Sequence, residues 1–128
     1  MNIESVNFEL TTKELEKLTD IETMTLKSLT EKYPDIRDDF QTPLCRFGDL
    51  SVALDHRIPD QYRDDGQVKE NRGINFVEIR RDGVTVDFEP VSFSSLKDTV
   101  TRKLEYKTAN EKRNVSVTFR LVYQNLFE

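Results

Sequence analysis

The densest group of side chains able to bind a metal or transfer protons lies in the polar stretch from Asp55 to Gly73. Its carboxylates and its single imidazole come from Asp55, His56, Asp60, Asp64 and Asp65. An EF-hand would need oxygen ligands at alternate positions around a central glycine. Centring such a loop on Gly66 places Gln61 and Arg63 at the first and third ligand positions, so the pattern fails. Basic residues also alternate with the acids, which makes mutual neutralisation the simpler interpretation.

A second arrangement is similar to a nuclease motif. Pro59 and Asp60 precede Glu78-Ile79-Arg80 on a predicted strand, as in the PD…(D/E)xK motif of metal-dependent nucleases, whose carboxylates hold magnesium. The position of the motif's lysine carries Arg80, which does not readily lose its proton. The net charge of −5 also opposes binding to DNA. We therefore do not expect a nuclease, and nucleic acid is not an expected partner.

Cys45 and His56 are the residue types of a nucleophile and its base, because an imidazole beside a thiol can take its proton. A lone cysteine between Leu44 and Arg46 is more typical of a small buried hydrophobic residue. The sequence contains no serine-nucleophile motif and no glycine-rich phosphate loop, since its four glycines are spread singly. It therefore predicts no enzyme activity and no cofactor.

The single cysteine and single histidine limit the sites that one copy of the chain can form. They exclude an internal disulfide and a zinc site of the usual Cys/His type. No run of about 18 apolar residues predicts a membrane-spanning helix, and the N-terminus lacks the basic and apolar regions of a secretory signal. We expect a cytoplasmic protein, or one within an assembled particle, without a membrane partner.

The composition predicts a core with few apolar residues under a highly charged surface. Apolar residues make up 36% of the 128 residues and charged residues 34%, against a typical charged fraction of about 25%. This length fits one domain, residues 1–128. A partner that buries more apolar area would add stability to so lean a core. With 19 basic and 24 acidic residues, the surface is attracted to basic partners rather than to phosphate or anionic lipid.

Two segments are candidates for contact with a partner protein or for self-association. Basic residues collect in the region 99–113, namely Arg102, Lys103, Lys107, Lys112 and Arg113. Lysines that protect an exposed hairpin edge from unwanted pairing are the alternative interpretation. The polar stretch 55–73 is the second segment, because long loops in compact domains are often functional. Its candidate contact residues are Asp60, Tyr62, Asp64 and Asp65.

Periodicity in the N-terminal third predicts a strand followed by helix. Residues 6–10 alternate apolar and polar side chains, as in a half-buried strand. Residues 12–33 carry an apolar face at helical spacing and begin with a capping-box pattern at Thr11. A second such pattern at Thr19 allows a break there into two helices. Pro34 is expected to end the segment.

The clearest local signal is Asp82-Gly83, a dipeptide favoured in two-residue hairpin turns, between two apolar runs. With Arg81 opposite Val84, the apolar residues of both runs share one face. The residues expected on that shared face are Val77, Ile79, Val86 and Phe88.

The remaining chain gives weaker signals. Residues 50–54 alternate as a short strand, and residues 35–47 look irregular. Residues 115–123 alternate over a long strand. Residues 99–107 fit a strand that pairs with it, although a helix starting at Ser94 is the alternative. We favour the strand, which makes a second long hairpin.

Together these patterns predict an α+β fold: one antiparallel sheet of five or six strands, built on β-hairpins, with the 12–33 helical segment packed on one face. We expect a non-enzymatic module that acts by protein–protein contact, as a structural or accessory component of a larger assembly such as a phage particle. The first alternative is an acidic inhibitor or immunity-type protein that binds a basic partner such as a nuclease. The second is a small metal-dependent enzyme using the acids of the polar stretch.

Overall fold

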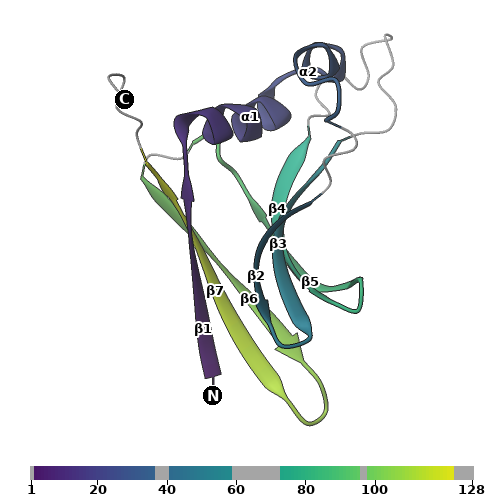
Figure 1. Cartoon of the computed structure of the whole chain (residues 1–128), viewed down its shortest axis with the longest axis vertical. Helices are drawn as coiled ribbons and strands as arrows, with labels where there is room; N and C mark the ends of the chain where they lie inside the picture. The colour runs from purple at the N-terminus through teal and green to yellow at the C-terminus, as the bar shows by residue number, and fades with distance from the viewer. Residues whose placement is uncertain (1, 37–40, 59–72, 96–97, 123–128) are drawn as a thin grey trace.

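The computed structural model describes residues 2–36, 41–58, 73–95 and 98–122, in which seven strands and two helices are found (Figure 1). Along the chain they are β1 (Asn2–Leu10), α1 (Thr12–Thr23), α2 (Leu26–Lys32), β2 (Gln41–Phe47), β3 (Leu50–Arg57), β4 (Ile74–Arg81), β5 (Val84–Val91), β6 (Thr99–Lys107) and β7 (Lys112–Leu121). The α+β class is confirmed. So are the hairpins, because β2–β3, β4–β5 and β6–β7 are antiparallel pairs of neighbours in the chain.

The strands form two sheets, so the expectation of one sheet with five or six strands is wrong. The first sheet has the order β1-β7-β6 and the second the order β2-β3-β4-β5. Within them, β1 runs parallel to β7, whereas the other pairs are antiparallel. The additional strand, β2, comes from the stretch 35–47 that looked irregular. Its Pro43 lies on an edge strand and next to a bulge, the two places in a sheet where proline is tolerated.

The helical segment splits into two helices, but later than the sequence suggests. α1 starts with the expected capping box, in which the Glu14 N–H donates to Thr11 Oγ1 (3.1 Å) and the Thr11 N–H donates to Glu14 Oε1 (3.0 Å). Thr19 lies inside α1, and the break comes just before Thr25, whose side chain caps α2. The segment ends before Pro34, as expected.

Both helices lie across one end of the two sheets (Figure 1). α1 contacts β1 of the first sheet and β4 of the second. It therefore bridges the sheets, and the expectation that the helical segment packs on one face of a sheet is wrong. A small apolar cluster of Ile21, Leu29 and Ile36 joins the two helices to the segment that follows them.

The β4–β5 hairpin has the predicted turn. Asp82 and Gly83 adopt φ angles of 52° and 79°, which a two-residue turn between twisted strands requires. Arg81 pairs with Val84, as expected.

Beyond this turn the register differs from the prediction. A bulge shifts the pairing by one residue, so that Ile79 lies opposite Asp87 and Glu78 lies opposite Phe88. Because successive side chains point to opposite faces of a strand, a one-residue shift exchanges the faces. Val86 and Phe88 are 41% and 55% exposed, whereas Val77 and Ile79 are buried, so the prediction that all four share one face is wrong.

The strand interpretation of residues 99–107 is confirmed. β6 pairs with β7 over its whole length, and the alternative helix starting at Ser94 is excluded. β3 continues to Arg57, so the first three residues of the stretch expected as a polar loop belong to a strand instead.

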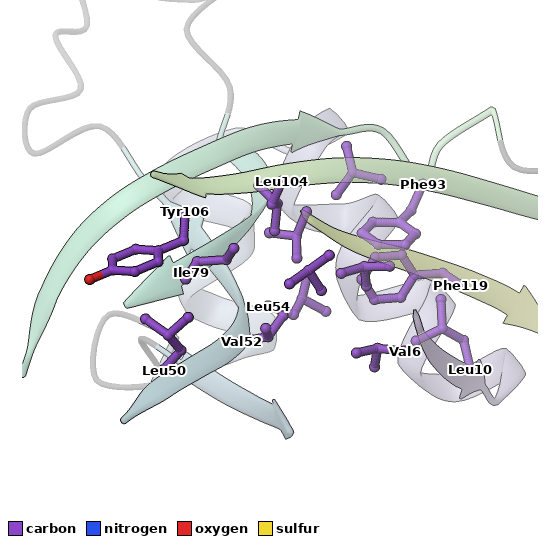
Figure 2. Close-up of a cluster of buried hydrophobic side chains, with 14 residues drawn as sticks. Val6, Leu10, Leu50, Val52, Leu54, Ile79, Phe93, Leu104, Tyr106 and Phe119 are labelled. Carbon is purple, nitrogen blue, oxygen red and sulfur yellow. The ribbon is translucent and has the colours of Figure 1, made fainter. Parts of the chain in front are cut away.

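The main core lies between the two sheets (Figure 2). Each sheet contributes the inward side chains of its alternating strands, such as Val117 and Phe119 of β7 and Val52 of β3. Phe93, from the segment after β5, meets the Phe119 ring edge to face, with centroids 5.2 Å apart.

Gly73 allows α1 to approach β4 closely. A Cβ at this position would lie 2.7 Å from both Cγ2 and the carbonyl oxygen of Ile21. We expect Gly73→Ala to lower the free energy of unfolding by about 2 kcal/mol through overpacking, as measured by urea denaturation. Gly48→Ala is the control, because nothing lies within 4 Å of a Cβ there and only its φ of +62° opposes a side chain. Equal losses for the two variants would contradict a clash at Gly73.

Candidate functional site

The outer face of the second sheet, turned away from the core, carries exposed apolar side chains. Ile74 is 47% exposed, and it lies near Val86 and Phe88 along a groove of about 330 Å³. We call this feature the β4–β5 groove; it is lined by Arg57, Ile74, Phe76, Glu78, Thr85, Val86, Asp87 and Phe88. Single apolar residues on a surface are ordinary, but a contiguous patch of them marks a binding surface.

Aromatic rings form the centre of the groove. The rings of Phe76 and Phe88 meet edge to face, with centroids 5.8 Å apart. The guanidinium carbon of Arg57 lies 5.8 Å from the Phe76 ring centroid, at cation–π distance. Phe76 itself is buried, whereas Phe88 stays exposed. The groove therefore offers an aromatic edge to whatever binds there.

The floor of the groove is a buried carboxylate. Glu78 is 2% exposed, although it points away from the main core. Its Oε1 lies 3.1 Å from Arg80 Nη1, and the Thr85 hydroxyl donates to its Oε2 (3.0 Å). Arg80 also donates to the carbonyl of Gly83 at the hairpin turn. Because these donors compensate its charge, Glu78 gives the groove a neutral floor.

A second carboxyl, that of Asp55, lies beside Glu78. Asp55 stands opposite Phe76 in the β3–β4 ladder. Burial raises the pKa of the Asp55 carboxyl, and the negative charge of Glu78 raises it further. In the described part of the chain, no three His, Cys, Asp or Glu side chains come together to hold a metal ion.

The sequence suggested two catalytic arrangements, and the structure assembles neither among the residues it describes. Of the nuclease-like motif, Glu78 and Arg80 pair with each other, and Asp60 lies outside the described residues. Cys45 stands opposite Val52 in the β2–β3 ladder. His56 is therefore about 13 Å further along β3, and its Nε2 lies 3.0 Å from a backbone carbonyl oxygen, that of residue 36. Burial raises the pKa of the Cys45 thiol, which keeps it protonated.

The basic residues of region 99–113 do not gather into one patch. Arg102 and Arg113 lie on the core-facing side of the first sheet, and Lys103, Lys107 and Lys112 lie on its outer side. Lys107 and Lys112 stand opposite each other in the ladder.

Both arginines are engaged in bonds that hold the fold together. Arg102 donates through Nε to the Pro90 carbonyl (2.8 Å), which ties β6 to β5. Arg113 Nη2 lies 2.6 Å from Glu4 Oε1, which ties β7 to β1. Among the lysines, Lys112 Nζ lies 3.6 Å from a carboxylate oxygen of Glu105. Contact of the five basic residues with a partner stays a prediction.

The other predicted contact residues, Asp60, Tyr62, Asp64 and Asp65, lie outside the described residues. Sequence reasoning did not identify the groove, because it placed Val86 and Phe88 on the same face as Val77 and Ile79, which are buried. The apolar alternation of β5 was visible, but no residue type marks the bulge that turns it outward.

Comparison with known protein families, curated proteins and solved structures finds no match to this chain. Neither of the two helices that the structure describes has the length and apolar character needed to cross a membrane.

Proposed function

We propose that this protein is a non-enzymatic module that binds another protein through the β4–β5 groove, as a structural or accessory component of a larger assembly. The observation that carries the proposal is the exposure of Val86 and Phe88 side by side with a second aromatic ring, that of Phe76. Burying apolar surface stabilises by about 25 cal/mol per Å², so covering these side chains favours association. A phage or another multi-subunit particle is the kind of assembly that fits.

The outer face of the first sheet supports the choice of the groove by contrast. The outward residues of β6 and β7 are polar, and Thr101 of β6 and Thr118 of β7 share a hydrogen bond of 2.9 Å between their hydroxyls. The polar groups of such a face are satisfied by hydrogen bonds to one another and to solvent. Of the two outer faces, the one formed by β4 and β5 therefore gains more from a partner.

The alternative of an acidic inhibitor for a basic partner rests on the overall charge of −5. The groove does not add to it, because Arg57 and Arg80 stand among its acids. Binding through the groove is thus governed by apolar contact rather than by net charge.

Site-specific photo-crosslinking tests the proposal. Replacing Val86 with p-benzoylphenylalanine and irradiating the protein in an extract of the source organism is expected to give a covalent adduct of one defined mass, because the probe lies in the groove. The partner is identified by mass spectrometry of the adduct. The same probe at Thr101, on the outer face of the first sheet, is the matched control. An adduct at Thr101 alone, or none at Val86, would contradict binding through the groove.

A further inference from the structure

We propose that the β4–β5 groove binds the same groove of a second copy of this chain, around a two-fold axis that sets the two β4 strands in opposite directions. This inference rests on the proposed function and names the partner. The helices lie across one end of the sheets and leave the outer face of β4 and β5 uncovered by helix (Figure 1). A two-fold pairing requires a surface that is complementary to itself.

The charges at the two ends of β4 provide this complementarity. Arg57 stands opposite Ile74, at the first residue of β4, and Asp82 follows the last residue of the same strand. No ion pair or hydrogen bond joins either side chain to another described residue. Between them, by contrast, Glu78 and Arg80 form an ion pair with each other. β4 thus has at one end a cation, and at the other end an anion, that no ion pair or hydrogen bond joins to another residue in the described part of the chain.

Turning one copy around brings opposite charges together at both ends. The eight residues of β4 span about 26 Å. The middle of this span is the position where Glu78 faces Phe88, so the two Phe88 rings would meet at the axis. Arg57 of each copy would then approach Asp82 of the other. Rim charges of this kind fix the orientation of a complex more than its affinity.

The size of the face is consistent with a weak dimer. Four strands about 4.8 Å apart and about 26 Å long present on the order of 500 Å² of flat surface. Specific interfaces bury about 800 Å² of accessible surface per partner, and crystal contacts less. We therefore expect dissociation in the micromolar range rather than an obligate dimer.

Charge reversal followed by mixing tests both the partner and the orientation. The wild-type protein is expected to be dimeric in sedimentation equilibrium at high concentration. Arg57→Glu alone places a glutamate against Asp82 at both ends, and Asp82→Lys alone places a lysine against Arg57 at both ends. The dissociation constant of the dimer should rise on the order of ten- to a hundred-fold in each single variant. An equimolar mixture of the two variants should recover dimers. At one end of a mixed pair the introduced glutamate faces the introduced lysine, and at the other end the native Asp82 faces the native Arg57.

Native mass spectrometry of the mixture identifies the recovered dimer as mixed, and thermal melting shows that each variant is folded. A folded Phe88→Asp variant should be monomeric whatever its charges. A wild-type protein that stays monomeric at its solubility limit would overturn the inference. So would single variants that dimerise like the wild type, or a mixture that does not recover.

The two proposals fail separately. If the Val86 probe crosslinks another protein and the wild type is a monomer, the proposed function stands and the second copy is excluded as the partner. If the probe gives no site-specific adduct, neither with another protein nor with a second copy, the groove is not a binding surface.

Discussion

Replacing Phe119 with alanine is expected to lower the free energy of unfolding by about 4 kcal/mol, the typical cost of removing a fully buried ring. Phe119 is completely buried in β7, the central strand of the first sheet. Its ring meets that of Phe93 edge to face, with centroids 5.2 Å apart (Figure 2), and that of Phe8 with centroids 6.0 Å apart. Truncation therefore removes two aromatic contacts and leaves a cavity between the sheets. Urea denaturation measures the loss.

Phe88→Ala is the matched control for Phe119→Ala. Both remove a phenylalanine ring from a strand, but Phe88 is more than half exposed and contacts one other ring, Phe76. We expect this variant to lose about 1 kcal/mol or less, since surface substitutions away from special features have small effects. Equal losses for the two variants would show that Phe88 is held by the fold itself, which would remove the argument that it awaits a partner.

Replacing Glu22 with alanine is expected to lower the free energy of unfolding by about 3 kcal/mol, because it would deprive several donors of their shared acceptor. Glu22 Oε2 accepts from Asn75 Nδ2 (2.6 Å) and from the Phe93 N–H (2.8 Å). Its Oε1 accepts from the Ser92 hydroxyl (2.7 Å) and from the Ser94 N–H (3.3 Å). One carboxylate thus fixes α1 to β4 and to the segment after β5.

The control for this variant is Glu31→Ala, in α2, where the side chain is exposed. It removes the same charge from a helix and should change the free energy of unfolding by about 0.5 kcal/mol or less. Glu22→Gln should fall between the two, because an amide keeps one acceptor oxygen and adds a donor that faces other donors. A loss for Glu22→Ala no larger than that of Glu31→Ala would show that water replaces the carboxylate at this junction.

Glu22 also shows why a local pattern can be read two ways. Thr19 and Glu22 have the spacing of a capping box, which suggested a helix start at that point. In the structure the carboxylate turns away from its own helix and binds donors about 70 residues away in sequence, at Ser92 and Phe93. The residue types were recognised as hydrogen-bonding groups, but their partners could not be found along the chain.

Elements that depend on neighbouring residues were predicted from the sequence. The capping box at Thr11, the Asp82-Gly83 turn and the β6–β7 hairpin follow from short-range geometry and alternation. The parallel pairing of β1 with β7 was not predicted, because it joins the two ends of the chain. The division into two sheets and the place of α1 across one end of both likewise depend on contacts across the whole molecule.

In the candidate site, too, some features follow from the sequence and others depend on long-range contacts. The sequence by itself determined the apolar alternation of β5, the turn before it and the acids and arginines around it. Only the tertiary structure decided which face that alternation occupies. β5 lies next to β6, where Asp87 accepts from the Glu105 N–H (2.8 Å) and the Pro90 carbonyl accepts from Arg102 Nε (2.8 Å).

Those bonds to the other sheet explain the bulge. In the regular register, Val86 would lie opposite Ile79, and Asp87 would point outward, away from the Glu105 N–H. The bulge instead sets Asp87 opposite Ile79, on the side of β6. Val86 and Phe88 are left in the outer groove as a consequence. The exposed face thus accompanies a hydrogen bond to one backbone N–H of a distant strand, that of Glu105, a requirement that the alternation of β5 alone does not contain.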